Sequence, residues 1–186
     1  MGISMILKIQ RLLTLCLAAL LATASALSAA KTVSLDKFRI QKQISGWTEE
    51  KSSYQAFGPK ELFTIIDGGA PEYIDNGLKK GFLQRISGPD SAAIELYAED
   101  FKSEGNAQKM FSAKQAASSG QLSTIPPDTA KVLVNEVIGG VWMCAAMGQY
   151  YFELTLTGVK DTASGKTKIG TILDYIGKTA KGLPLK

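Results

Sequence analysis

The sequence predicts an α+β fold: a single domain with helices packed against an antiparallel sheet of about five to seven strands. Three patterns predict this fold. Apolar residues alternate with polar ones over 92–99, two glycine-containing turns interrupt the apolar segment 132–157, and apolar residues recur at helical spacing over 162–181. Helices are expected near 59–76, 103–118 and 162–181, and segment 132–157 is expected to form a three-stranded meander.

The first helical region is expected to be broken in two. A Gly-Pro pair at 58–59 opens a helix, because proline suits the first helical turn. Its apolar residues would share one face: Leu62, Phe63, Ile65 and Ile66. Gly68 and Gly69 end this helix, since glycine adopts left-handed backbone angles at low cost. A short second helix begins at Ala70 and ends before Gly77.

Strands are expected on both sides of this region, at 47–57, 80–87 and 92–101. In the last of these, the residues at even positions are apolar and the odd positions carry Glu95, Tyr97 and Glu99, as in a half-buried strand. We interpret these acids as part of a solvated strand edge and not as a glycosidase pair. The segment 123–131 contains two adjacent prolines and is expected to be a loop.

The meander has the most informative sequence. Pairs at 139–140 and 148–149 suit two-residue hairpin turns, which fix the register of three strands. The pairs expected across the turns are Ile138 with Val141 and Met147 with Tyr150. One face is then almost entirely apolar and is expected to form the core.

The opposite face of the meander contains a candidate small-molecule site. It places Cys144 in one row with Asn135 and Glu153, beside Trp142 and Tyr151. A carboxylate next to a thiol raises the thiol pKa, which is the opposite of what a nucleophile requires. A buried, inert structural cysteine is therefore the alternative interpretation of Cys144.

The first thirty residues are typical of a secretory signal peptide. Lys8 and Arg11 precede an apolar run, and small residues follow it, with cleavage expected after Ala30 or after Ala26. The predicted organisation is a signal peptide at 1–30 and one domain at 31–186, located in the periplasm or secreted. We expect no integral membrane anchor. Because cleavage removes two positive charges and leaves a nearly neutral chain without a basic patch, we also expect no nucleic acid partner.

The composition excludes several kinds of catalysis. The chain has no histidine, so it can form neither a Ser-His-Asp site nor a His-ligated metal site. Once Cys16 has been removed with the signal peptide, Cys144 can form no intramolecular disulfide. We predict no cofactor and no catalytic residue, and a protein or small molecule of unknown identity as the partner.

Two segments resemble known ligand-binding motifs but do not match them. Asp67, Glu72 and Asp75 surround a Gly-Gly bend, but their spacing differs from the alternating oxygen ligands of a calcium-binding loop, so no metal site is predicted. Gly165-Lys166-Thr167 lacks the glycine that a phosphate-binding loop has five positions earlier, where this chain has Lys160.

The segment ELFTIIDGGAPEYIDNGL, followed by an acidic strand and a helix, resembles an uncharacterised family of exported bacterial domains. The matching residues are Leu62, Phe63, Asp67, Gly68, Gly69, Ala70 and Tyr73. The chain departs from the family at Pro71 and Glu72, where members more often have the glutamate directly after the alanine. The resemblance covers about residues 40–180 and implies export and an α+β fold, without an established activity.

Taken together, these patterns favour an exported, non-catalytic binding or interaction module. A carboxylate-dependent hydrolase or lyase and a subunit of an envelope assembly are the alternatives. The candidate ligand-binding residues come from the Gly-Gly bend and from the mixed face of the meander: Asp67, Gly68, Gly69, Ala70, Tyr73, Trp142, Cys144, Tyr151 and Glu153.

Overall fold

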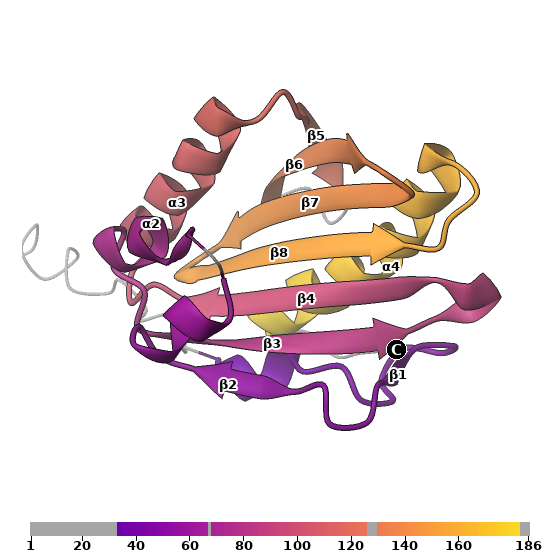
Figure 1. Cartoon of the computed structure of the whole chain (residues 1–186), viewed down its shortest axis with the longest axis horizontal. Coiled ribbons are helices and arrows are strands. Elements are labelled where there is room, and N and C mark those ends of the chain that lie inside the picture. The colour runs from indigo at the N-terminus through magenta and orange to yellow at the C-terminus, as the bar shows by residue number, and fades with distance from the viewer. Residues whose placement is uncertain (1–32, 67, 126–129, 183–186) are drawn as a thin grey trace, which may run out of the picture. The chain divides into compact units, whose positions relative to one another are not determined.

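The computed structural model describes residues 33–66, 68–125 and 130–182, with the backbone alone at 123–125 and 130. Its core is one antiparallel sheet with the strand order β1-β3-β4-β8-β7-β6-β5, and the short strand β2 also pairs with β3 (Figure 1). The predicted α+β fold, with an antiparallel sheet and a three-stranded meander at its C-terminal end, is confirmed. The short strands β1 and β2 bring the sheet to eight strands.

The elements of the described part of the chain have the following bounds. The strands are β1 (Thr48–Glu49), β2 (Gln55–Phe57), β3 (Lys80–Ser87), β4 (Ala93–Asp100), β5 (Gln121–Ile125), β6 (Ala130–Val137), β7 (Gly140–Met147) and β8 (Tyr150–Thr157). The α-helices are α2 (Ala70–Asp75), α3 (Glu104–Ala117) and α4 (Thr162–Ala180). Three 3₁₀ turns complete the list: η1 (Leu35–Phe38), η2 (Glu61–Thr64) and η3 (Pro89–Ser91).

Helices cover the two faces of the sheet unequally. Helix α4 crosses one face, where its fully buried Ile169, Ile172 and Ile176 join the larger hydrophobic core with η1. Helices α2 and α3 lie over one end of the opposite face and bury a second apolar cluster there (Figure 1). Among the described residues, no helix lies in front of the other end of that face. This difference leaves part of the sheet surface exposed.

The two long helices begin where short polar side chains cap them. The Ser103 hydroxyl accepts a hydrogen bond from the Asn106 backbone N–H at 3.2 Å, as expected for the N-cap of α3. The Asp161 carboxylate does the same for α4 through the Ser164 N–H at 2.7 Å. These caps fix the helix starts and so the positions of the side chains that face the sheet.

The helix expected from residue 59 is only the short 3₁₀ turn η2. The Glu61 carboxylate accepts a hydrogen bond from the Gly58 N–H at 2.9 Å, which opens the turn. Because a 3₁₀ turn has three residues per turn, Leu62 is buried while Phe63 points to solvent and is 60% exposed. The prediction that Phe63 shares the buried face was therefore wrong, whereas the short second helix, α2, is present.

The first hairpin turn of the meander lies one residue earlier than predicted. Val137 pairs with Gly140, so Ile138 and Gly139 form the turn, and Gly139 alone of these has a positive φ, of 72°. Gly140 belongs to the strand, paired with Thr157 of β8, and only glycine fits there because a Cβ would lie 1.9 Å from the Leu156 carbonyl oxygen. The pairing is displaced by two residues, which keeps every side chain on its predicted face.

The second hairpin agrees with the prediction. Met147 pairs with Tyr150 across the turn, and Gly148 has a positive φ of 58°.

Two other segments differ from expectation. The strand expected over 47–57 is divided into β1 and β2 by a turn in which Ser52 has a φ of 61°. The loop expected at 123–131 overlaps the end of β5 and the start of β6, and residues 126–129 lie outside the described part.

Candidate functional site

One face of the sheet carries four of the predicted candidate residues, Trp142, Cys144, Tyr151 and Glu153, together with the uncovered surface. We call its covered part the Glu153 cluster; it consists of Tyr73, Glu99, Lys114, Trp142, Cys144, Tyr151 and Glu153. We call its uncovered part the open face; it consists of Arg85, Glu95, Asn135, Val137, Thr155 and Thr157, with Leu122 at its edge. Trp142 lies between the two parts.

The strand register explains which candidates meet. Cys144 on β7 pairs with Glu153 on β8, and Glu153 pairs with Tyr97 on β4. Adjacent positions on neighbouring strands lie on the same face, so the thiol and the carboxylate are neighbours, as predicted. Asn135 is not in this row, because the displaced register pairs it with Trp142.

The Glu153 carboxylate accepts hydrogen bonds from three aromatic side chains. The Tyr73 hydroxyl donates to Oε1 at 2.5 Å and the Tyr151 hydroxyl donates to the same oxygen at 2.9 Å. The Trp142 Nε1–H donates to Oε2 at 3.2 Å. The Glu153 side chain is 14% exposed. Four predicted candidates from α2, β7 and β8 therefore form one hydrogen-bonded group.

Lys114 joins α3 to this group. Its Nζ lies 2.9 Å from the Glu72 carboxylate on α2 and 3.9 Å from that of Glu153. It also lies 4.8 Å from the centre of the Tyr73 ring, within range of a cation–π interaction. Lys114 was not among the predicted residues, and its position on α3 gives no local signal in the sequence.

The tyrosines of the cluster act as hydrogen-bond donors. Burial, and then the Glu153 charge, raise the pKa of Tyr73 above its ordinary value. The same two causes raise the pKa of Tyr151 well above its ordinary value. Both hydroxyls therefore keep their protons and donate hydrogen bonds to the carboxylate.

Cys144 is fully buried. Burial is the largest cause that raises the pKa of its thiol to about 12, and the Glu153 charge adds to the increase. A thiol is an effective nucleophile only as the thiolate. The environment therefore suits the inert structural cysteine and not a nucleophile.

The sequence analysis missed Glu99. It was interpreted as part of a solvated strand edge, which was wrong because β4 is an inner strand, paired on both sides by β3 and β8. The Glu99 side chain is fully buried, and neither carboxyl oxygen has a hydrogen-bond partner among the described residues. Burial, followed by the Glu153 charge, raises the Glu99 pKa well above its ordinary value, whereas Lys114 lowers it.

The Gly-Gly bend contributes to the cluster through Tyr73. Gly68 has a φ of 70° and is exposed, and Ala70 is fully buried where α2 begins. A Cβ on Gly69 would lie 2.8 Å from the Ile66 side chain. Asp67 lies outside the described residues. The bend therefore sets the direction from which α2 carries the Tyr73 hydroxyl to the sheet.

Glu72 and Asp75, the acids around the bend that the structure describes, have different surroundings. Glu72 contacts Lys114, and Asp75 is exposed to solvent. Within 33–66, 68–125 and 130–182, no group of three or more Cys, Asp or Glu side chains is arranged to hold a metal ion.

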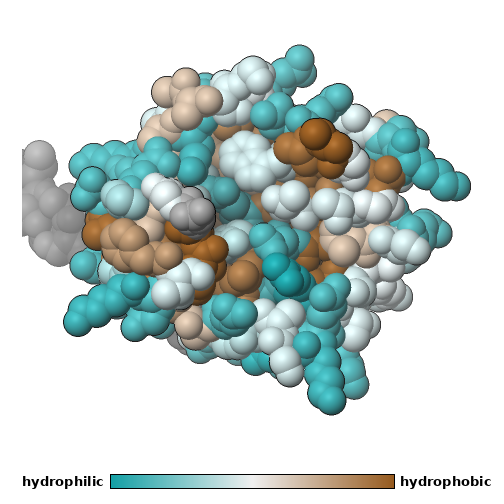
Figure 2. All heavy atoms as spheres, viewed as in Figure 1, coloured by the Kyte–Doolittle hydropathy of each residue, from teal (hydrophilic) through white to brown (hydrophobic). Residues whose placement is uncertain are grey.

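Across the open face, charged residues on β3 and β4 give way to threonines on β8 and then to exposed apolar residues on β5 and β6. Arg85 on β3 forms an ion pair with Glu95 on β4 at 3.0 Å. Thr155 and Thr157 follow on β8. At the far side Leu122 is 52% exposed and Val137 is 38% exposed. Hydrophobic residues reach the surface in this part of the face, at the upper right of Figure 2.

Ile138 lies beside the open face, in the turn between β6 and β7, and is fully exposed. The hollow on the face itself is small, about 210 Å³. It lies between Glu50, which follows β1, and strands β3, β4 and β8. It is lined by Glu50, Arg85, Ala93, Ile94, Glu95, Thr155 and Thr157.

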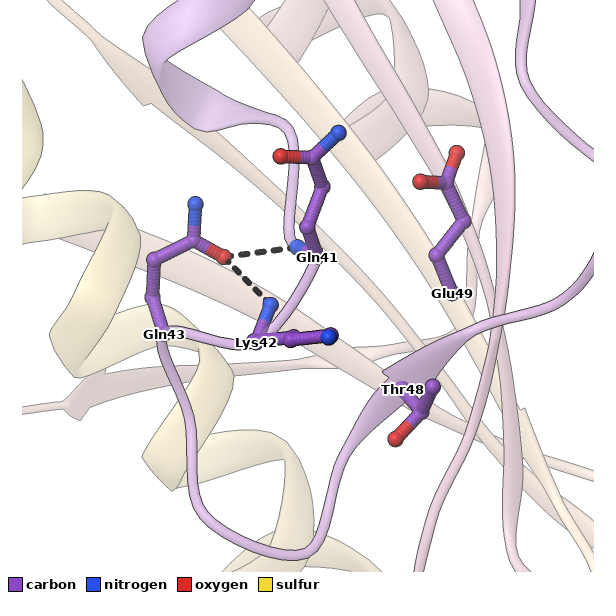
Figure 3. Close-up of a pocket in the computed structure, with 5 residues that line it drawn as sticks. All are labelled: Gln41, Lys42, Gln43, Thr48 and Glu49. Carbon is purple, nitrogen blue, oxygen red and sulfur yellow. Dashed lines mark hydrogen bonds between the residues drawn. The ribbon is translucent and has the colours of Figure 1, made fainter.

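A larger cleft, of about 650 Å³, lies beside the edge strand β1. It is lined by Gln41, Lys42, Gln43, Thr48 and Glu49 (Figure 3). The Gln43 side-chain oxygen accepts hydrogen bonds from the backbone N–H groups of Gln41 and Lys42. The Glu49 carboxylate is held by Arg39 at 2.7 Å. None of the lining residues is hydrophobic or aromatic, whereas ligand pockets are typically lined mainly by such residues.

Comparisons with known proteins complete the description. No protein-family model matches the chain, and no significant match was found among curated proteins. The fold is similar to that of the extracellular domain of PknH from Mycobacterium tuberculosis, with a TM-score of 0.49 and 11% sequence identity over 81% of this chain and 100% of that one. None of the helices in the described ranges is both long and apolar enough to cross a membrane.

Proposed function

We propose that the chain is an exported, non-catalytic module that binds a protein partner through the open face. The exposure of Leu122, Val137 and Ile138 on or beside this face, where no helix covers the sheet, supports the proposal. Exposed apolar surface bordered by polar residues is typical of protein–protein contact surfaces. Trp142 adds an aromatic side chain of the kind that contributes strongly to such contacts.

The shape of the open face favours a protein over a small molecule. Its hollow of about 210 Å³ is smaller than the roughly 300–1,000 Å³ of small-molecule pockets. Its charges also argue against nucleic acid. Arg85 is paired with Glu95, and Glu50 lies nearby, so the surface has no excess of positive charge to contact phosphates.

The hydrolase or lyase alternative has one observation in its favour. Glu99 and Glu153 lie in the same cluster, and the Glu153 charge raises the Glu99 pKa. A general acid or base must reach the reacting atoms of a substrate. Glu99 is fully covered and Glu153 is occupied by three hydrogen-bond donors. The arrangement therefore favours a structural role for these acids.

Site-specific photo-crosslinking in intact cells tests the proposal. A photo-reactive residue replaces Thr155 on the open face, and in a control chain it replaces Thr171, which is exposed on α4 behind the opposite face. We expect one discrete protein adduct from position 155 and none from position 171. The double variant Val137→Lys and Ile138→Lys, combined with the label at 155, should lose that adduct.

The mass of the adduct separates the outcomes. An adduct with a different protein supports the proposal. Equal adducts from both positions, a mass increase that fits only a small molecule, or no adduct from an exported, folded chain would each overturn it. An adduct with a second copy of the chain would indicate self-association through this face, and would overturn the proposal of a different protein as the partner.

A further inference from the structure

Glu99 occupies a space that the fold provides for it. It pairs with Gly81 on β3 and with Tyr151 on β8. A Cβ on Gly81 would lie 3.0 Å from the Glu99 Cγ and 2.4 Å from the Phe57 ring. The glycine therefore leaves room for a carboxyl group beneath an aromatic ring. Isolated buried charges are costly, so an acid in this position is stable in its neutral form.

The groups that face Glu99 come from every element packed around it. Glu153 and Tyr151 face it from β8, Tyr73 from α2, and Lys114 from α3. Tyr97 precedes it on β4, on the same face, and Cys144 lies near it on β7. The cation among these groups, Lys114, is shared between Glu72 and Glu153. A second negative charge in the cluster would have no cation of its own there.

We infer that Glu99 is a proton-controlled latch beneath α2: with its proton it remains buried, and its ionisation releases α2 from the sheet. The ionised Glu99 carboxylate must gain access to water or to a cation. Of the elements that lie over the cluster, α2 makes the fewest contacts with the rest of the fold. It is six residues long and begins next to the exposed Gly68. Short elements of this kind open more readily than core strands.

The hydrogen bonds of the cluster define what opens. The bond from Tyr73 to Glu153 and the ion pair from Lys114 to Glu72 attach α2 to β8 and α3. Two carboxylates ionised side by side repel each other, which weakens the first of these contacts. Opening of α2 would expose the aromatic side chains around Glu153 next to Trp142. This inference does not depend on the proposed protein partner.

Hydrogen exchange measured by mass spectrometry tests the inference on the wild type and on Glu99→Gln. Peptides that cover α2 are compared with peptides from α4 between pH 6 and pH 9, after correction for the intrinsic pH dependence of exchange. In the wild type, protection of α2 should begin to fall at some point in this range. Because one proton is released, the fall should approach about tenfold per pH unit, while α4 is unchanged. Glu99→Gln should show no such fall.

A spectroscopic measurement makes the test independent of how well the variant folds. The infrared carbonyl band of a protonated carboxylic acid should be present in the wild type at neutral pH and should persist while the protection of α2 falls, because the tenfold fall per pH unit requires a closed state that still holds its proton. Parallel exchange profiles for the wild type and Glu99→Gln would overturn the inference. So would a wild type in which the acid band is absent at neutral pH, or in which the band disappears at higher pH while α2 keeps its protection.

Discussion

Tyr73 on helix α2 donates a hydrogen bond to Glu153 on strand β8, although the two residues are 80 positions apart in the sequence. This bond joins the Gly-Gly bend to the mixed face of the meander. Tyr73 from the first group of candidate residues and Glu153 from the second are therefore parts of one cluster. The bond also makes the attachment of α2 to the sheet accessible to experiment.

Tyr73→Phe should destabilise the fold by about 1.5–3 kcal/mol, because it removes one donor from a partly buried carboxylate and keeps the ring. Urea unfolding measures the effect. Tyr54→Phe is the matched control, since the Tyr54 hydroxyl donates to Asp36 at 3.2 Å in an exposed position. The control should lose about 0.5 kcal/mol. Equal losses in the two variants would mean that the Tyr73 hydroxyl has no special role.

Cys144 should react very slowly with iodoacetamide near pH 8 in the native mature chain. The thiol is fully buried, and burial raises its pKa to about 12, so little thiolate forms. Mass spectrometry after timed quenching measures the modification, and the same protein unfolded in urea is the control. Fast alkylation of the native protein would contradict the burial of Cys144.

Gly81→Ala should destabilise the protein by about 1–3 kcal/mol, because the added methyl group would overlap the Phe57 ring and crowd Glu99. Gly170→Ala on α4 is the control, since no atom lies within 4 Å of the added Cβ. That variant should gain about 0.5–1 kcal/mol from the higher helix propensity of alanine. A neutral Gly81→Ala would show that the space above β3 is not filled as described.

The pH dependence of stability should identify Glu99 as a buried acid. Because its pKa is raised in the folded state, mainly by burial, the folded protein binds a proton that the unfolded chain releases. The stabilising contribution is therefore fully present below the unfolded pKa, at about 4.3, and is lost as the pH rises towards the folded pKa. Glu99→Gln should gain stability relative to the wild type as the pH rises from 4 to 8.

Thermal unfolding of both proteins across this range measures the difference. The Gln side chain keeps the size of the acid and cannot ionise, so the comparison isolates the proton. A difference in stability that does not vary with pH would show that Glu99 has the same protonation state when folded and unfolded.

Much of the fold could be predicted from local patterns. The alternation over residues 93–98 of β4 and the spacing of apolar residues in α4 each depend on neighbours in the sequence, and each was confirmed. The turn at Ile138–Gly139 was misplaced because the sequence cannot show that the β8 backbone approaches Gly140. The faces were still correct, since a displacement by two residues preserves them.

The candidate site was predicted in part. Trp142, Cys144, Tyr151 and Glu153 were found because they share one hairpin, and Tyr73 was found through the family resemblance. Glu99 and Lys114 were missed because their roles depend on which strands are inner and on where α3 crosses the sheet. Both are products of long-range packing, which single-sequence periodicity does not report.

The strand order has a consequence for how the chain is made. The middle of the sheet is the pairing of β4 with β8, and β8 is the last strand to be synthesised. Until Tyr150–Thr157 arrives, β4 and β7 each have a long unpaired inner edge. Such edges are the ones most prone to pair with other chains. A chain truncated before β8 should therefore aggregate instead of forming a smaller stable domain.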